Sequence, residues 1–514
     1  MLIRLLLAIL MLLGTASARA LDPDIFDTLA AFPASGHVFV VLDDAAAEHR
    51  RPAGASLEAA LDDLGDFAGT AEAWGELAQA LGLTPGRAFD ELLGRRCVLL
   101  MTDVGEGGQW ALLTEVQPHV EKRLIARLRP SPRQIKGGLP ILAVENGRFD
   151  LVTSPNRIPH RNVAAGERIS TILIAPASSR ELFDQMLPLL RGEAAADPVG
   201  SRGWFAQARQ IAPGEIVMLA RHPRDADRFV ALSARPSPRA ADMGWDGSLR
   251  ASSAFVSPWF DLAAATPWSP PSLSTLSPDV VLASIGSSDR LTAMLSSLSC
   301  ASGALLPDLP DQPGSRSGII VRHDPSPIAL RDPLSCTLFR ESPNILAQSQ
   351  HMDEHFTRRI LNVRSPDSHV ATMFKGMPVE SVRTFTIDDG GCRTAVSWCG
   401  RPTAGGQGWT LAHAAPDLTA AARSAAWLRK VGDALAGAPS QESARVLTAG
   451  SVRPARLLDA VKTPRVFAAA ADALNAARWV DQATWSVHLD DEGVVAGSFT
   501  IRMKRSGIPD RPMR

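Results

Sequence analysis

Three side chains in the pentad HMDEH, residues 351–355, have the types and spacing that could hold a metal ion. His351 and His355 are four residues apart, so on a helix both imidazoles project from one face toward one ion. Glu354 lies between them and could act as the general base that activates a metal-bound water. One interpretation of the pentad is therefore a zinc-dependent hydrolytic site in which Glu354 is the catalytic residue.

The spacing H-x-x-E-H resembles the motif of the inverted zincins. The resemblance covers five residues and implies a third metal ligand, usually a glutamate on a helix tens of residues downstream. Glu442, in APSQESARV, is the better placed candidate, because Glu380 directly precedes a strand-like run. The resemblance thus implies His351, His355 and Glu442 as the ligands of a zinc ion.

The elements around the pentad also permit a simpler interpretation. The helix that would carry it has an apolar stripe formed by Ile345, Met352, Phe356 and Ile360. On a helical wheel the two histidines lie beside this stripe and the glutamate lies nearly opposite it, as on a solvated helix face. This interpretation predicts no bound cofactor and a non-catalytic role, with zinc as the alternative.

The N-terminus, MLIRLLLAILMLLGTASARA, has the three parts of a secretory signal peptide. Arg4 supplies the positive charge, Leu5 to Leu13 is apolar, and small residues precede a cleavage point. The apolar run is about half of the roughly 20 residues that a membrane-spanning helix requires. We therefore expect cleavage near Leu21 and a soluble mature chain in the periplasm or outside the cell.

The charge balance bears on the partners of the chain. The formal net charge is −1, and it becomes −3 on cleavage because the signal carries Arg4 and Arg19 and no acid. A nucleic-acid-binding protein needs a clustered basic footprint, and the tail RMKRSGIPDRPMR is the one basic patch that stands out. We expect no nucleic-acid partner and no membrane-spanning segment after cleavage. An envelope protein is the kind of partner that the sequence still permits.

Five cysteines leave at least one thiol without a partner inside the chain. Cys392 and Cys399 are separated by seven strand residues, roughly 23 Å at about 3.3 Å per residue, against a disulfide limit near 7 Å. That local pair is therefore excluded. Cys300 with Cys336 is the disulfide to test first, and most of the five cysteines are predicted to be buried small residues.

The pattern of elements predicts an α+β fold with antiparallel sheets in two halves. Hairpins are expected at Asn146-Gly147 and at two Asp-Asp-x-Gly turns, residues 388–391 and 490–493. A Pro/Ser-rich stretch separates the halves. The predicted organisation is a signal peptide at 1–20, an N-terminal half at 21–265, a linker at 266–279, a C-terminal half at 280–505 and a basic tail at 506–514.

A strand–turn–helix pattern at 169–190 recurs at 279–298, with a looser copy from Gly408. Duplication of a unit of about 110 residues is one explanation, and the common chemistry of tight turns is the other. The layout of signal peptide, repeated strand–helix–hairpin units and closing hairpin resembles exported bacterial proteins grouped as domains of unknown function. This resemblance implies no catalytic residues. The sequence thus favours an exported binding or interaction module, with a zinc-dependent hydrolase as the alternative.

Overall fold

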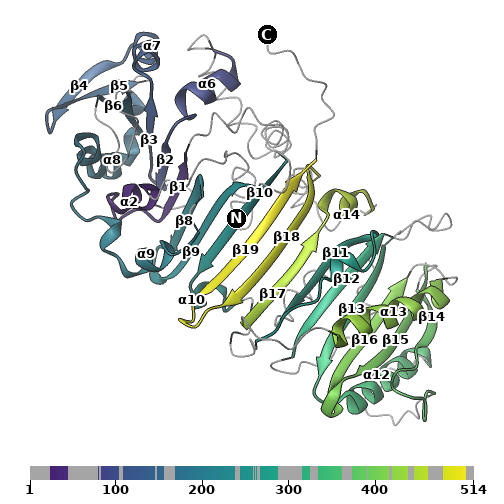
Figure 1. The fold of residues 1–514 in the computed structure, drawn as a ribbon. Helices are drawn as coiled ribbons and strands as arrows, with labels where there is room; N and C mark the ends of the chain where they lie inside the picture. The colour runs from purple at the N-terminus through teal and green to yellow at the C-terminus, as the bar shows by residue number, and fades with distance from the viewer. Residues whose placement is uncertain are drawn as a thin grey trace. The chain divides into compact units, whose positions relative to one another are not determined.

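A computed structural model describes most of the chain between Asp24 and Lys504 (Figure 1). The described residues are 24–43, 79, 83–102, 108–144, 147–155, 168–212, 214–237, 243–258, 260, 262, 267–286, 315–323, 334–361, 373–389, 392–415, 420–437, 445–460 and 478–504. The predicted signal peptide, Cys300, Glu442 and the basic tail at 506–514 lie outside them.

The α+β prediction is wrong, because the protein is richer in strands than that class. Of the described residues, 44% are in strands and 30% in helices. Part of the excess comes from two strands at 225–236 and 244–251, which contain Arg, Asp and Gly at several positions. Such residues weaken an alternating apolar pattern, so these strands gave little signal in the sequence.

The described residues form two compact units. The first contains the residues up to Phe255, those of Ala470–Val480 and those from Val494 onward, and the second contains Val256–Ala469 and Asp481–Gly493. The stretch predicted as a linker contributes Trp268 and Leu273 to the buried core of the second unit.

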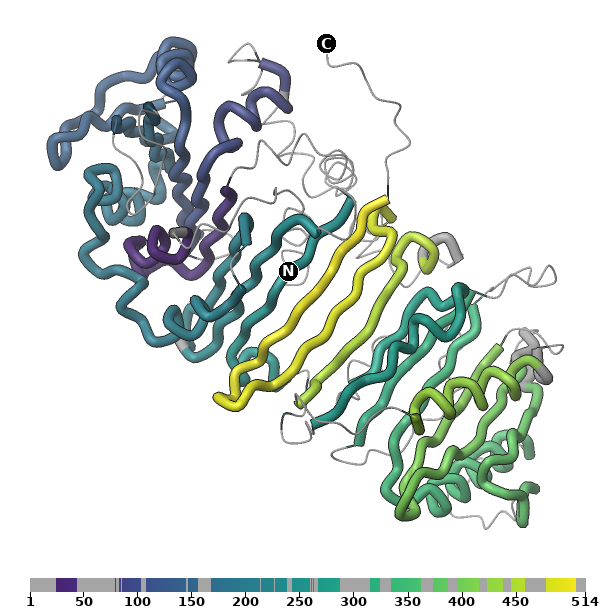
Figure 2. Tube along the Cα trace, in the orientation of Figure 1, coloured from purple at the N-terminus to yellow at the C-terminus, as the bar shows by residue number. Residues whose placement is uncertain are grey.

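In the first unit, eleven strands form one antiparallel sheet. Their bounds are β1 Val38–Leu42, β2 Cys97–Met101, β3 Trp110–Val116, β4 Ser131–Lys136, β5 Leu139–Val144, β6 Phe149–Ser154, β7 Ser170–Pro176, β8 Ile216–His222, β9 Asp225–Pro236, β10 Gly244–Ala251 and β19 Val495–Met503. The pairings give the order β4-β5-β6-β7-β3-β2-β1-β8-β9-β10-β19. The last strand, β19, lies beside β10 although about 250 residues separate them (Figure 2).

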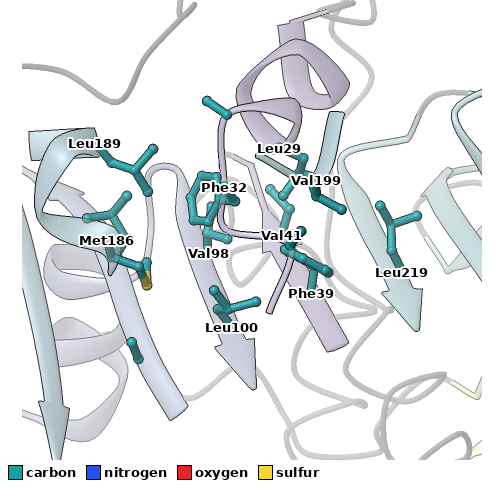
Figure 3. Close-up of a cluster of buried hydrophobic side chains, with 14 of the residues drawn as sticks. Leu29, Phe32, Phe39, Val41, Val98, Leu100, Met186, Leu189, Val199 and Leu219 are labelled. Carbon is teal, nitrogen blue, oxygen red and sulfur yellow. The ribbon is translucent and has the colours of Figure 1, made fainter. Parts of the chain in front are cut away.

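Helices cover both faces of this sheet. They are α2 Asp24–Ala30, α6 Pro85–Leu92, α7 Pro118–Leu128, α8 Arg180–Met186, α9 Gly203–Ala208 and α10 Ser253–Val256, with short 3₁₀ turns η3 Ala177–Ser179, η4 Leu187–Arg191 and η5 Val199–Ser201. Val120 of α7 belongs to the cluster of Leu151, whereas Met186 of α8, labelled in Figure 3, belongs to the cluster of Val152. Neighbouring residues of a strand point to opposite faces, so α7 and α8 lie on opposite sides of the sheet.

In the second unit, eight strands pair in an antiparallel order. Their bounds are β11 Val280–Gly286, β12 Ser317–His323, β13 Leu334–Ser342, β14 Arg383–Asp389, β15 Cys392–Pro402, β16 Gly408–Ala415, β17 Arg445–Val452 and β18 Val480–Leu489. The order is β14-β15-β16-β13-β12-β11-β17-β18. The helical elements are α12 Ile345–Ile360, α13 Ala420–Ala436, α14 Pro454–Ala460, η6 Leu273–Thr275 and η8 Ala404–Gly406.

The two faces of this second sheet also carry one long helix each. Phe356 of α12 belongs to the cluster of Trp398, and Leu428 of α13 to the cluster of Cys399. Trp398 and Cys399 are adjacent in β15, so the two helices cover opposite faces.

The two units repeat one topology. Reading from the edge, β5-β6-β7-β3-β2-β1-β8-β9 corresponds to β14-β15-β16-β13-β12-β11-β17-β18. The helix after the third strand is α7 or α12, and the helix after β7 or β16 is α8 or α13. Eight strands and two helices therefore follow one another in the same sequence order in both units, and β4, β10 and β19 are additions in the first unit.

The register of the strands repeats as well. The Glu115 N–H donates to the Arg96 carbonyl oxygen at 2.9 Å, and the Glu341 N–H donates to the Arg316 carbonyl oxygen at 2.8 Å. Counting along the pairings from these positions aligns core residues, such as Leu173 with Leu411, 238 residues apart. The repeated unit is thus close to half of the chain.

This topology does not follow the 110-residue period considered from the sequence. Strand β7 lies between β6 and β3, whereas β11 lies between β12 and β17, so the stretches from 169 and 279 occupy different positions. The counterpart of β7 is β16, which lies in the stretch from Gly408, the looser of the predicted copies of the strand–turn–helix pattern.

Two of the expected hairpins are confirmed. Strand β5 pairs with β6 across Gly147, whose φ is +85°, and Asp389 of β14 pairs with Cys392 of β15. None of the helices among the described residues is both long and apolar enough to cross a membrane.

Candidate functional site

The helix α12 carries the pentad, as the sequence predicted. The Asn344 side chain accepts a hydrogen bond from the Ala347 N–H at 3.1 Å, which satisfies one of the free N–H groups at the start of the helix. Ile345, Met352 and Phe356 are buried, so the predicted apolar stripe faces the sheet.

The three proposed zinc-site residues of the pentad lie on the outer side of α12. His351 and Glu354 are exposed, and His355 is half-buried with its ring 5.4 Å from that of Phe356. Glu442, the implied third ligand, lies outside the described residues. Within the part of the chain that the structure describes, no group of three His, Cys, Asp or Glu side chains is arranged to hold a metal.

The buried polar residue of the pentad is instead Asp353. Its Oδ1 accepts a hydrogen bond from Trp398 Nε1 at 2.8 Å and lies 2.8 Å from Arg383 Nε. The side chains of Arg383 and Asp353 are only 2% and 7% exposed. Arg383 Nη1 also donates to the carbonyl oxygens of Val379, at 3.3 Å, and Ser381, at 2.7 Å. Asp353 therefore ties α12 to β14 and β15.

Burial raises the pKa of Asp353, and the contacts with Trp398 and Arg383 act in the opposite direction. The indole that binds the carboxylate is itself fixed by two aromatic rings. Phe356 stacks on Trp398 with ring centroids 4.1 Å apart, and Phe374 meets it edge-on at 5.0 Å. This polar triad, Asp353, Arg383 and Trp398, is thus enclosed by apolar packing.

The first unit has apolar residues at the corresponding positions. Arg383 pairs with Trp398 as Leu142 pairs with Leu151. Leu151 is buried under α7, and Leu142 packs against the same cluster. One copy of the repeat therefore fills this position with hydrocarbon and the other with a buried ion pair, so the topology itself does not require the polar triad.

The cysteines with described surroundings are buried. Cys336 lies on β13, but its proposed disulfide partner, Cys300, lies outside the described residues. Burial raises the pKa of Cys97 to about 12 and that of Cys399 to about 11. Both thiols are therefore protonated at neutral pH, which suits packing and not nucleophilic chemistry.

A buried histidine that the sequence did not single out lies under α13. His413 Nδ1 is 2.8 Å from Thr337 Oγ1, which also accepts a hydrogen bond from Trp427 Nε1 at 2.9 Å. Burial, and secondarily the positive charge of Arg322, lower the pKa of His413 to about 3. The imidazole is therefore neutral at pH 7, and through the Thr337 hydroxyl it is linked to Trp427 of α13.

A hollow beside α8 in the first unit is the described feature most suited to binding a ligand. Its volume is about 470 Å³, within the range of roughly 300–1,000 Å³ usual for small-molecule sites. This α8 hollow is lined by Pro33, Ser35, Glu181, Asp184, Gln185, Pro188, Ala195, Ala196 and Asp197. Its residues come from three separate segments of the chain, so no local sequence pattern indicates it.

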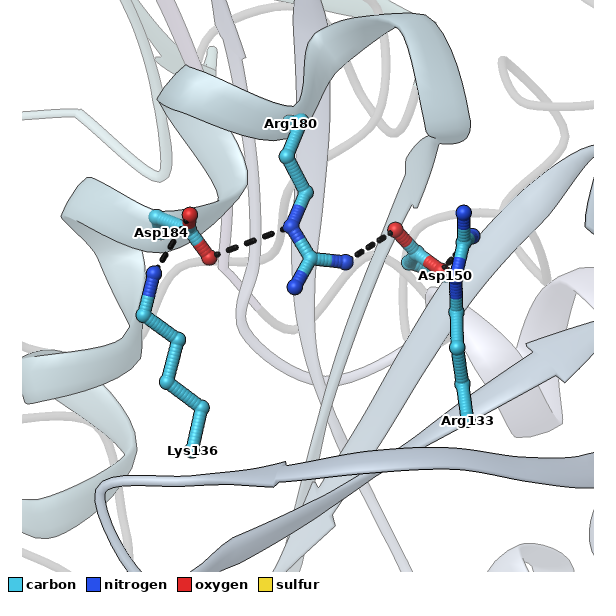
Figure 4. Close-up of polar contacts among 5 residues, drawn as sticks. All are labelled: Arg133, Lys136, Asp150, Arg180 and Asp184. Atoms are coloured by element: carbon cyan, nitrogen blue, oxygen red, sulfur yellow. Dashed lines mark hydrogen bonds and ion pairs between the residues drawn. The ribbon is translucent and has the colours of Figure 1, made fainter.

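Three carboxylates line the α8 hollow. Asp184 forms two ion pairs: its Oδ2 lies 2.6 Å from Lys136 Nζ, and its Oδ1 lies 3.5 Å from Arg180 Nε (Figure 4). Asp197 forms an ion pair with Arg202. Glu181 is exposed, and among the described residues its carboxylate has no ion-pair partner.

A second carboxylate, that of Asp150, forms ion pairs with Arg133 and Arg180 beside the hollow. Asp150, whose side chain is 1% exposed, binds Arg133 at 2.7 Å and Arg180 at 2.9 Å (Figure 4). Arg180 thus bridges Asp150 and Asp184, and the alternating charges fix α8 against β4 and β6. The hollow has a rigid wall on this side.

Comparisons with models of protein families, with curated proteins and with solved structures found no match.

Proposed function

We propose that the chain is an exported, non-catalytic binding protein whose α8 hollow takes a small ligand with a cationic group. The carrying observation is a cavity of about 470 Å³ in which Glu181, Asp184 and Asp197 meet. Of these three carboxylates, Glu181 remains for a ligand after the internal ion pairs are formed. A carboxylate in a partly enclosed site favours an ammonium or guanidinium group.

The remaining lining limits the size and shape of the ligand. Pro33, Pro188, Ala195 and Ala196 offer apolar surface, and Gln185 offers an amide. An amine or guanidine on a short aliphatic body would bury its carbon chain there while its cation reaches Glu181. Agmatine and putrescine are probes of this kind.

The polar triad supports a binding role over a hydrolytic one. Asp353 uses the inward position of the pentad to anchor α12, and His351 and Glu354 face outward. Export through residues 1–20, a periplasmic or extracellular location and an envelope protein as a further partner belong to the same proposal.

Calorimetric titration of the mature protein with agmatine and putrescine tests the ligand site. We expect saturable binding that Glu181→Gln reduces at least tenfold, because this change removes the charge and keeps the shape. Glu354→Gln, which neutralises an exposed glutamate in the other unit, is the matched control. Absence of binding by both probes, or equal binding by Glu181→Gln, would reject the α8 hollow as the site.

Elemental analysis separates this role from the zinc alternative. We expect no stoichiometric zinc in the purified mature protein. Stoichiometric zinc that is lost in both His351→Ala and His355→Ala would favour the hydrolase instead. Export is tested separately by deleting residues 1–20 and measuring where the protein accumulates.

A further inference from the structure

The helix α7 and the edge strand β4 form a second basic segment of the chain, in addition to the C-terminal tail RMKRSGIPDRPMR. Residues 118–136 contain six Lys and Arg residues and one acid, Glu121. Arg123 is paired with Glu91 at 2.6 Å, and Arg133 and Lys136 are paired with Asp150 and Asp184. Three cations are left, namely Lys122, Arg127 and Arg129.

These three cations are exposed, Lys122 on the outer side of α7, Arg129 at its C-terminal end and Arg127 at the edge of its buried side. Val120 and Leu124 bury the inner side of the helix against the sheet. Within the described part of the chain, none of the three side chains forms an ion pair. Their charges are therefore available to an external partner.

Arg129 stands in an unusual backbone conformation. It is the C-cap of α7, with φ 43° and ψ 53°, and is the only described residue other than glycine with positive φ. Glycine normally occupies such a position, because other residues meet a steric cost there. An arginine retained at that cost points to a use for its side chain.

The same face of the sheet presents one exposed apolar side chain, Ile135, which is 78% exposed. Lys136 reaches Asp184 on α8, so its neighbour Ile135 points to the opposite face, the one that α7 covers. The pairing agrees: Ile135 lies opposite Pro140, whereas Lys136 lies opposite Leu139, which packs with the core under α8. Ile135 is therefore on the side of Lys122, Arg127 and Arg129.

We propose that this basic face, formed by Lys122, Arg127, Arg129 and Ile135, docks on a membrane surface that carries anionic phospholipid headgroups. Long cationic side chains reach headgroup phosphates, and an exposed apolar side chain on the same side of the sheet enters the boundary of the acyl chains. An acidic protein would be expected to meet a wider apolar centre than a single isoleucine. The neighbouring hairpin turn, Gly137-Gly138, leaves Ile135 near the tip of its strand.

Vesicle flotation of the full mature protein tests this surface. We expect binding to vesicles in which a third of the phosphatidylcholine is replaced by phosphatidylglycerol, no binding to pure phosphatidylcholine, and release at high salt. Lys122→Ala and Arg127→Ala should each lower the partition coefficient about fivefold, and the triple variant with Arg129→Gly on the order of a hundredfold. Ile135→Ser should lower it severalfold, by the same factor at each salt concentration at which the unaltered protein still binds.

Two variants separate docking from folding and from general charge. Arg129→Gly suits the left-handed cap, so it should bind less tightly while its thermal midpoint stays equal or rises. Lys375→Ala with Arg224→Ala removes two exposed cations elsewhere and should leave binding unchanged. Equal binding to neutral and anionic vesicles, an unchanged triple variant, or binding to a soluble acidic protein without vesicle binding would overturn the proposal.

Discussion

Replacing the polar triad of the second unit with the apolar residues of the first provides a quantitative test of the repeat. Arg383→Leu places a leucine opposite Trp398, the same residue type that the first unit has at the corresponding position, Leu142. It leaves the Asp353 carboxylate, 7% exposed, with the indole as its remaining described donor. Breaking a buried ion pair by removing one partner costs about 3–5 kcal/mol, because the other charge stays buried without compensation.

Asp353→Asn removes the opposite charge. The Asn oxygen can still accept from Trp398 Nε1, and Arg383 keeps its two carbonyl acceptors on Val379 and Ser381. We therefore expect a cost of about 3 kcal/mol, at the lower end of the same range.

The double variant Asp353→Asn, Arg383→Leu removes both charges and keeps the indole hydrogen bond. Because neither buried charge remains, we expect it to cost less than either single change. Replacing a buried ion pair by apolar groups is often neutral or stabilising by about 1–4 kcal/mol. The double-mutant cycle should therefore give a large favourable coupling between the two side chains.

Urea unfolding followed by circular dichroism measures these free energies, and hydrogen exchange of residues 345–360 assigns them to α12. Arg202→Leu breaks the exposed pair with Asp197, whose side chains are 45% and 65% exposed, and serves as the control. A surface pair contributes about 0–1 kcal/mol. A cost below about 1 kcal/mol for Arg383→Leu, or additive costs in the double variant, would refute the assignment of a buried, energetically coupled ion pair to Asp353 and Arg383.

Three further outcomes are expected. Folding lowers the pKa of His413 to about 3, so the neutral imidazole stabilises the folded state fully above the unfolded pKa of about 6.5. This stabilisation is lost as the pH falls from about 6.5 toward 3. The difference between the urea midpoints at pH 7 and at pH 4.5 should therefore be smaller for His413→Asn than for the unaltered protein. Since burial raises the pKa of Cys97 to about 12, this thiol should not react with a disulfide reagent in the native protein at pH 8, and Cys97→Ser should leave the native reaction unchanged. Arg129→Gly should raise the free energy of unfolding by up to about 1 kcal/mol, measured by urea unfolding, because glycine accepts the positive φ of the α7 cap; a lower value would contradict the strain assigned to Arg129.

Local turn chemistry made part of the fold predictable. Asn146-Gly147 and the Asp388-Asp389 turn specify hairpins through positive φ and short side-chain contacts, and both hairpins are present. The amphipathic α12 was predictable for the same kind of reason, because the spacing of Ile345, Met352 and Phe356 fixes which side is buried.

Ser178 and Glu181 have the S-x-x-E spacing of a helix capping box, but the structure does not use it. The N-cap of α8 is Ser179, whose hydroxyl accepts from the Trp110 N–H of a neighbouring strand and makes no cap hydrogen bond. A long-range contact has replaced the local one, and no neighbouring residue in the sequence records it.

The candidate site was hidden for a similar reason. Ser35, Glu181 and Asp197 come together only through strand pairings that span the first unit. In the pentad, sequence reasoning selected His351, Glu354 and His355 because these types do chemistry. It passed over Asp353, whose partners Arg383 and Trp398 lie 30 and 45 residues away.

The pairing of β10 with β19 has a consequence for the order in which the protein is made. Ser248 lies opposite Ser498, so the first unit lacks a strand until almost the whole chain has been synthesised. A sheet completed by so distant a segment closes slowly, since the loop-closure entropy must be lost before the strand pairs. The half that emerges first therefore remains unfinished while the second half is translated.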